Sequence, residues 1–436
     1  MLDVHTRDGN RTGNTFRVAA SASNAGVMAE GPLGGKKRGS WMIGARKSYL
    51  QYIFQRTFPD TSYIFGFEDV QGRVSYDLTP KHNITLYVLE SYSELNRDLT
   101  SKLGVNSLVN GGYHYTLGNL GWRYAPSEKL LIVNHAAWMR EKFDNYNPTK
   151  RPLGAGFYGE WVWNTNATWM WNKQTPLDVG WSVRRLRGNQ VANQYQANTP
   201  LPRLLDHSDG TALRESGYAQ QTWMPWAGRL HLTAGVRWDH HSTDDVAAVS
   251  PQVSASLALA QGTRIQLGFG QYVQYPEIPL LTSPLGSRGL LPMRSNHWLG
   301  AVEQRLGPRT RIRAEYYNRA DRARGFEVFV QRSSANGATG WVSYAFGRTG
   351  MRDGVTGNHF PSDFDQRHTL NIYGGYRLKP TVNLSGKVSY GSGFPIPGYL
   401  RKVGTLYYLS EARNQLRMEP YVRTDVRLNK SWTRDR

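Results

Sequence analysis

The chain has 436 residues, a formal net charge of +20 and no cysteine. The lack of cysteine excludes thiol nucleophiles, disulfides and cysteine-ligated metal sites. No run of about 18 apolar residues occurs, which excludes a transmembrane helix, and no linker-like segment divides the chain into separate soluble domains.

The N-terminal segment has no visible export signal, because Leu2–Asn10 lacks the apolar core of a signal peptide. Two short strands are predicted near 15–22 and 25–31. Further along, apolar and polar residues alternate with the period of a strand. This pattern predicts strands that include 70–78, 157–172, 229–238, 369–378 and 422–428.

The strand predicted at 157–172 is the most informative. One parity carries Trp161, Trp163, Trp169 and Trp171, and the other parity is mostly polar. Aromatic rings settle at the two interfaces of a bilayer, so this pattern indicates a strand that crosses a membrane. A large soluble β-sandwich is the alternative, but many predicted strands exceed the roughly five to six residues typical of soluble sheets.

The predicted connections alternate between short and long. Short turns are predicted at 34–39, 79–81, 125–129, 173–176, 226–228, 260–262, 307–309, 333–340 and 379–381. Long polar connections are predicted at 49–62, 95–110, 145–155, 188–210, 274–296, 348–367 and 392–419. The connections at 239–247 and 320–325 are short where a long one is expected. Short turns on one side and long loops on the other are typical of outer-membrane barrels. The sequence therefore predicts an all-β fold, an antiparallel transmembrane β-barrel of about twenty strands.

The positive charge has two interpretations. A basic lumen or loop set would attract anionic ligands, whereas basic residues in loops and turns would meet anionic lipid headgroups. We favour the second interpretation, because the charges are spread over the chain rather than clustered. No run of basic residues or known motif supports nucleic-acid binding.

Candidate metal ligands meet at one predicted hairpin tip, at Asp239, His240, His241, Asp244 and Asp245. The fixed spacing of a known metal site is lacking, and a solvated loop tip is the favoured interpretation. The nucleophile elbow, the P-loop and the zinc-protease helix motif do not occur. We therefore predict no catalytic, cofactor-binding or metal-binding residues and no cofactor.

Four tyrosines are predicted either at the mouth of the lumen or in the interfacial aromatic girdles, namely Tyr272, Tyr275, Tyr316 and Tyr317. Because both positions favour tyrosine, none of the four is assigned as a ligand contact. The substrate-binding residues are not identified from the sequence.

Six segments, in chain order, resemble TonB-dependent outer-membrane receptors. The most specific is Ser362–Leu378, in which Asp365-Gln366-Arg367-His368 resembles the start of a late barrel strand in that family. Leu2–Asn10 resembles the exit from the plug domain. The other similar segments are Glu30–Ile53, Leu267–Leu281, Lys387–Tyr399 and Pro420–Trp432. The resemblance implies that His368 orients the start of its strand and has no catalytic role.

The resemblance also implies a domain organisation. Residues 1–13 would be the end of a plug or linker, and residues 14–436 would be the receptor barrel, truncated at its C-terminal end. The family's barrel has 22 strands and a plugged lumen, and a TonB box precedes the plug. We expect a truncated copy of such a receptor, without the plug, the TonB box, the final pair of strands and a terminal aromatic residue.

The function that the resemblance implies is TonB-dependent active uptake of a bulky nutrient, of the siderophore, cobalamin or oligosaccharide class. The expected location is the outer membrane of a Gram-negative-type bacterium. The expected partners are outer-membrane lipid and lipopolysaccharide, the extracellular nutrient, and the TonB complex through a plug that this chain lacks; a monomer is expected. A passive porin-like channel and an outer-membrane barrel enzyme are the alternatives.

Overall fold

The computed structural model of the protein describes residues 6–57, 63–97, 103–172, 174–196, 199, 201–243, 245–320, 323–333, 337–353 and 356–432. The chain divides into two compact units. Unit 1 comprises Met1–Gln220, Val236–Val249 and Gln274–Met293. Unit 2 comprises Gln221–Gly235, Ser250–Val273 and Arg294–Arg436.

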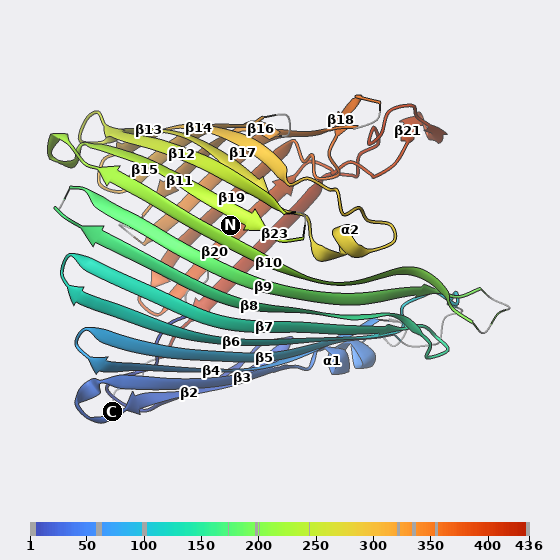
Figure 1. Ribbon diagram of the computed structural model, residues 1–436, viewed down its shortest axis with the longest axis horizontal. Coiled ribbons are helices and arrows are strands. Elements are labelled where there is room, and N and C mark those ends of the chain that lie inside the picture. Colours follow the sequence, from blue (N-terminus) through green and yellow to red (C-terminus); the bar gives the residue numbers. More distant parts are fainter. Residues whose placement is uncertain are drawn as a thin grey trace. The chain divides into compact units, whose positions relative to one another are not determined.

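Unit 1 is built from long strands that follow one another in chain order (Figure 1). Its strands are β1 (Thr15–Ala20), β2 (Asn24–Leu33), β3 (Gly39–Ser48), β4 (Tyr63–Thr79), β5 (His82–Arg97), β6 (Asn110–Ser127), β7 (Leu130–Tyr146), β8 (Pro152–Met170) and β9 (Pro176–Gln194). Each pairs antiparallel with the next, from β1–β2 to β8–β9. Three further strands have residues in both units: β10 (Arg203–Trp223), β11 (Leu230–His241) and β12 (Val246–Ala258).

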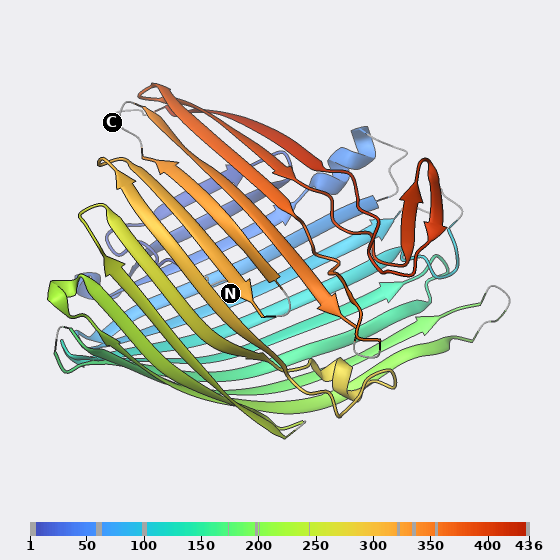
Figure 2. The ribbon, with the colours of Figure 1, turned by 90° about the horizontal axis from the view of Figure 1, so that it is seen from above.

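Unit 2 continues with strands of the same kind. They are β13 (Thr263–Gln274), whose last residue belongs to unit 1, β14 (Met293–Leu306), whose first residue does, β15 (Thr310–Arg319), β16 (Ala323–Arg332), β17 (Ala338–Arg352), β18 (His359–Pro361), β19 (His368–Lys379), β20 (Val382–Gly391) and β23 (Tyr421–Lys430). Strand β17 pairs with β19 over most of its length and with the short β18 at its end. The strands β21 (Leu400–Val403) and β22 (Leu406–Leu409) form a separate hairpin (Figure 2, red).

The helices are short and lie in connections. They are η1 (Gly35–Lys37), α1 (Leu50–Thr57), η2 (Trp226–Gly228) and α2 (Ile278–Thr282). In the described part of the chain, no helix is both long and apolar enough to cross a membrane.

The turns have ordinary local chemistry. In the β4–β5 turn the Thr79 hydroxyl accepts hydrogen bonds from the backbone N–H groups of Lys81 and His82, both at 3.2 Å. In the β14–β15 turn Gly307 has φ 68°, a left-handed conformation that glycine adopts without strain. In Figure 1 the short turns of β2 to β9 gather at one end of the strands and α1 lies at the opposite end. We call these the turn end and the loop end.

The two faces of the strands differ as the sequence predicts. On β8 the side chains of Trp161 and Trp163 are 63% and 52% exposed, whereas Glu160 on the other face is 3% exposed. Many large apolar side chains of neighbouring strands are exposed on the Trp161 face, among them Leu86, Val88 and Leu120. An apolar surface of this extent is not stable in water, so we expect lipid to cover it.

The predicted strand pattern is confirmed. Setting aside β18, β21 and β22, which have four residues or fewer, twenty strands occur among the described residues. The predicted strand at 157–172 corresponds to β8. The predicted segments 70–78, 369–378 and 422–428 lie within β4, β19 and β23, and the segment 229–238 begins one residue before β11.

Some predicted connections were too long. Strand pairing continues into 145–155 and 188–210, and leaves only 147–151 and 195–202 as connections. The helices α1 and α2 were not predicted within 49–62 and 274–296. Polar residues suggested loops at these positions. Polar residues also occur where a strand continues beyond its apolar band, because the backbone groups there remain paired.

Candidate functional site

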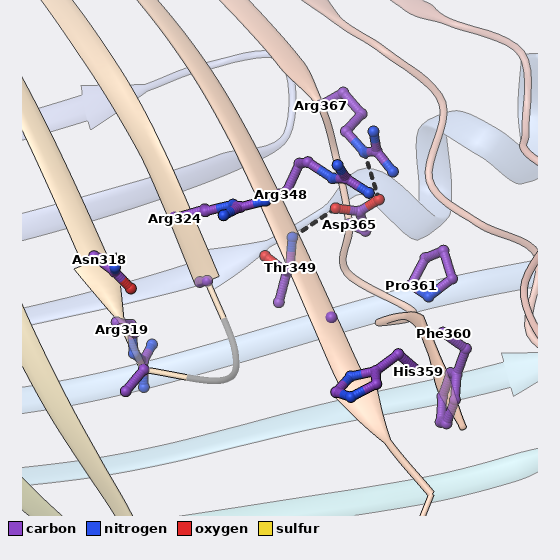
Figure 3. Close-up of a pocket in the computed structure, with 13 residues that line it drawn as sticks. Asn318, Arg319, Arg324, Arg348, Thr349, His359, Phe360, Pro361, Asp365 and Arg367 are labelled. Carbon is purple, nitrogen blue, oxygen red and sulfur yellow. Dashed lines mark hydrogen bonds and ion pairs between the residues drawn. The ribbon is translucent and has the colours of Figure 1, made fainter. Parts of the chain in front are cut away.

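A hollow of about 670 Å³ lies in unit 2, where β15 ends, β16 begins and β17 ends (Figure 3). It forms because β15 and β16 stop pairing at Arg319 and Ala323, whereas β17 continues to Arg352 and pairs there with β18. The strand ends and the β18–β19 connection line it. Its polar lining residues are Asn318, Arg319, Arg324, Arg348, Thr349, His359, Asp365 and Arg367.

The lining of this arginine hollow is strongly basic. Arg324 and Arg348 lie directly opposite each other in the β16–β17 register, on the face that carries Tyr316 and Phe326, whereas Arg319 is on the other face. Like charges directly opposite each other are destabilising. Within the described part of the chain, none of these three arginines has an ion-pair partner. A bound anion would offset this repulsion and accept charge-assisted hydrogen bonds from the guanidinium groups.

One carboxylate of the hollow, Asp365, is already occupied by neighbours. Its side chain is 1% exposed. It accepts hydrogen bonds from the backbone N–H of Thr349 at 2.6 Å and from Arg367 Nε at 2.7 Å (Figure 3). Arg417 also binds this carboxylate, and donates to the backbone carbonyl of Gly393 at 3.1 Å. Asp365 therefore joins the end of β17 to the connections before β19 and before β23.

The surroundings of Asp365 lower its pKa. Burial of the carboxyl group acts to raise the pKa, but the hydrogen bonds from Thr349, Arg367 and Arg417 stabilise the charged form and hold the pKa below its ordinary value of 3.8. The carboxylate is thus charged at neutral pH and holds the two arginines in place.

We expect the connection around Asp365 to open at low pH. When the pKa of a carboxyl group is lower in the folded state than in the unfolded state, the charged group stabilises the fold fully above the unfolded-state pKa. This stability is lost as the pH falls through the folded-state pKa, which for Asp365 lies below 3.8. Pepsin cleavage of residues 356–367 should therefore increase steeply only below about pH 4. Asp365→Asn should remove this dependence, and an unchanged pH profile in that variant would contradict the assignment.

A second hollow, of about 480 Å³, lies in unit 1 between β7 to β9 and the connection that carries α2. Glu160 binds Arg184 at 2.5 Å on the polar face of the strands. Tyr158 donates to the same carboxylate at 3.3 Å. Phe143, Ser208 and Glu277 also line this hollow. A lining that mixes opposite charges with aromatic rings suits a polar ligand that forms hydrogen bonds better than a ligand with a strong charge of one sign.

The α2 connection is anchored against the strands. Ile278 packs with Leu186 and Ala212 in a buried cluster, and the side chain of Arg214 donates to the carbonyl of Pro276 at 2.9 Å. A Cβ atom at Gly210 would lie 2.8 Å from Ile278 Cγ2. The glycine therefore permits the close approach of α2 to β10.

Of the five candidate metal ligands from the sequence, the four that the structure describes do not come together as a metal site. Asp239 is held by Arg237 Nε at 2.8 Å, and His240 Nε2 lies 3.1 Å from Asp245. His241 is buried beside the ring of Tyr275, with ring centroids 5.2 Å apart. Asp244 lies outside the described residues. Among the residues that the structure describes, no group of three metal-ligating side chains occurs.

The four tyrosines singled out in the sequence line neither hollow. Tyr275 donates to the carbonyls of Asp239 and Val246 at 3.0 and 3.1 Å, which indicates a structural role. Tyr316 is exposed on the face opposite Tyr317. The ring of Tyr272 lies against His297, with centroids 4.4 Å apart.

His368 is the first residue of β19, as the sequence suggested. Its Nδ1 lies 2.9 Å from the hydroxyl of Tyr344, and its backbone N–H donates to Ser392 Oγ at 3.0 Å. These contacts support a structural role at the start of the strand. The arginines of the hollow were not identified as candidate site residues from the sequence. The signal that could have identified them is the group of arginines around the short predicted connection at 320–325.

Comparison with known proteins gives consistent results. The family model described as TonB dependent receptor-like, beta-barrel matches residues 40–319, which is more than half of the chain. No curated protein matches the chain.

Several solved structures share the fold. A variant of the ferric enterobactin receptor of Pseudomonas aeruginosa has a TM-score of 0.71 at 13% identity, over 96% of this chain and 72% of that one. The ferric-catecholate import receptor Fiu of E. coli has a TM-score of 0.73 at 13% identity, over 98% and 76%. A copper transporter, OprC, has a TM-score of 0.73 at 13% identity, over 98% and 74%. The two-faced strands and the family match lead to one conclusion: this chain belongs to the family of TonB-dependent receptor-like β-barrels.

Proposed function

We propose that the chain forms the barrel wall of an outer-membrane receptor for TonB-dependent uptake of a bulky nutrient. Barrels of this family lie in the outer membrane of Gram-negative bacteria, and its members bind extracellular ligands and interact with TonB. The apolar face of the strands would contact lipid, and the polar face and loop end would contact the cargo. The chain itself would perform no covalent chemistry.

The observation that carries the proposal furthest is the arginine hollow. Arg319, Arg324 and Arg348 have no carboxylate partner among the described residues, and Asp365 is saturated by its own hydrogen bonds. An anionic cargo that reaches these strand ends beyond the apolar band fits this lining best, because Arg324 and Arg348 lie on the face of Tyr316 and Phe326 and Arg319 lies on the other face. Two of the similar structures are named as receptors for ferric enterobactin and ferric catecholates. Of the three cargo classes, we therefore favour an anionic metal chelate of the siderophore class.

Residues 6–13 support the proposal that the N-terminal segment is the exit from a plug. This segment runs along the polar face of β2 to β4, at the turn end. Arg7 binds Glu30 at 2.5 Å, and Asp8 binds Arg73 at 2.9 Å. Arg11 binds Asp77. We propose residues 1–13 as the end of a plug or linker and residues 14–436 as barrel. Coupling to TonB would require a plug joined to Leu2–Asn10.

The proposal is tested by binding of two ferric complexes to the chain refolded in detergent. The first is a trianionic ferric tris-catecholate and the second is a neutral ferric trihydroxamate. If each guanidinium contributes about 1 kcal/mol, replacing Arg319, Arg324 and Arg348 with Gln should raise the Kd of the trianion about 100-fold. The Kd of the neutral complex should change little.

A matched control replaces three exposed arginines elsewhere, Arg264, Arg309 and Arg401, with Gln. It removes the same charge and should leave both affinities nearly unchanged. Equal losses in the two triple variants would show that only net charge matters and would reject the hollow as the cargo site. Binding of neither ferric complex would instead favour a passive porin, and hydrolase activity would favour a barrel enzyme.

A further inference from the structure

The second hollow, in unit 1, owes its space to a glycine. Gly188 lies opposite Tyr158 in the β8–β9 register, and a Cβ atom built there would lie 3.7 Å from Tyr158 Cδ2 and 4.0 Å from Ile278 Cβ. A larger residue at this position would fill the gap between the strands and α2. The volume of about 480 Å³ lies within the range of about 300–1,000 Å³ that is typical of small-molecule sites. The hollow therefore has the size of a site for a small ligand.

One ion pair forms part of the wall of this hollow. The side chain of Glu160 is 3% exposed, and its two oxygens accept hydrogen bonds from Arg184 Nε at 2.5 Å and from the Tyr158 hydroxyl at 3.3 Å. The side chain of Arg184 is 45% exposed, and within the described part of the chain its two Nη groups donate no hydrogen bond. Since a guanidinium group has five N–H donors in a planar fork, Arg184 can bind a second carboxylate while it holds Glu160.

Two other carboxylates of the hollow lack a cationic partner. Among the residues that the structure describes, neither Glu141 nor Glu277 forms an ion pair. Glu141 is half-buried on β7 and lies near the neutral phenol of Tyr113, and Glu277 is exposed directly before α2. The charges of both carboxylates are therefore available to an ammonium group, which also interacts favourably with the aromatic rings of Phe143 and Tyr158.

A buried hydroxyl group of the hollow also lacks a partner. Ser208 lies on β10 and is 2% exposed, and its Oγ forms no hydrogen bond with any residue that the structure describes. A buried polar group without a hydrogen bond costs free energy, and a ligand that reaches β10 would offset this cost. The side-chain amide of Gln190, which lines the same hollow, offers a further donor and acceptor. The unpaired hydroxyl points to a polar ligand independently of the charges.

We propose that the second hollow binds a zwitterionic ligand of the amino-acid class, namely a short peptide with free termini. Arg184 would bind the terminal carboxylate through its Nη groups, and Glu141 and Glu277 would bind the terminal ammonium group. Ser208 would form a hydrogen bond with a peptide group, and the aromatic rings would contact an apolar side chain. A ligand without net charge suits a lining that carries both signs. The proposed cargo is an anion, so this site is a further one and does not rest on the proposed function.

The test compares three forms of one dipeptide, alanyl-phenylalanine, by isothermal titration calorimetry with the full chain refolded in detergent. The free dipeptide carries both charges, the N-acetylated form lacks the ammonium group, and the C-terminal amide lacks the carboxylate. We expect the Kd of the free dipeptide to be at least about tenfold lower than that of either other form, because each of these loses one set of charge-assisted hydrogen bonds. Equal affinity of the three forms, or binding of none of them, would overturn the proposal.

Glu141→Gln with Glu277→Gln should remove the advantage of the free dipeptide over the acetylated form. The matched control, Glu128→Gln with Glu411→Gln, removes the same charge at exposed positions elsewhere and should keep this advantage. Arg184→Lys retains the positive charge but lacks the planar fork, so it should weaken binding of the free dipeptide about tenfold and leave binding of the amide unchanged.

Equal effects of the two double variants, or equal weakening of the free dipeptide and the amide by Arg184→Lys, would also contradict the proposal. Binding of a ferric complex without binding of the dipeptide would contradict this inference alone. Binding of the dipeptide without binding of either ferric complex would support this inference and contradict the proposed function.

Discussion

Replacing Asp365 with Ala is expected to release the connections before β19 and before β23 while the strands stay folded. The carboxylate is buried and binds Thr349, Arg367 and Arg417, so its loss leaves two arginines without their partner. Removing one partner of a buried ion pair costs about 3 kcal/mol or more. Because 1.4 kcal/mol is a factor of ten, amide hydrogen exchange of residues 348–350 and 392–394 should accelerate about 100-fold.

The control for this prediction is Glu411→Ala, in the connection before β23, since Glu411 is exposed. Its exchange pattern should match that of the wild type. If Asp365→Ala left exchange at residues 348–350 unchanged, the carboxylate would not join these connections, and the geometry described for the hollow would be wrong.

A charge placed on the apolar face of β5 is expected to destabilise the protein in lipid. Leu86 is 46% exposed and lies opposite Val74 and Leu120, midway between His82 and the outward-facing Glu90. Arginine on the lipid-facing side of a barrel costs about 2–4 kcal/mol near the bilayer midplane. Leu86→Arg should therefore lower the free energy of unfolding in vesicles by about 3 kcal/mol, measured by urea titration.

The same substitution three residues along provides the comparison. Leu89 belongs to the other face of β5 and lies opposite Gln71 and Leu117. Leu89→Arg should cost no more than about 1 kcal/mol, because the new charge would face a polar lumen. Equal losses in the two variants would mean that neither face contacts lipid, as in a soluble sandwich.

The strands could be predicted from the sequence because their signal is local. Alternation on β8 places Trp161 and Trp163 on one face and Glu160 on the other, so the polarity of each residue indicates the face on which its side chain lies. The count of about twenty strands follows from the same rule. The α2 helix could not be predicted, because it depends on Ile278 finding Leu186 and Ala212, which are far apart in the sequence.

The candidate site was less predictable for the same reason. Arg324 and Arg348 come together only because β16 and β17 pair in one particular register. Asp365 was noted in a family-like string, but its partner Arg417 lies 52 residues away.

The central claim is that one face of these strands contacts lipid and the other lines a lumen. Since the chain has no cysteine, single cysteines can be introduced from 83 to 90 on β5 and spin-labelled in vesicles without a background signal. Accessibility to oxygen should peak at 84, 86 and 88, and accessibility to a water-soluble nickel chelate at 83, 85, 87 and 89, with the period of two of a strand. Equal accessibility of both parities to the nickel chelate would contradict the claim.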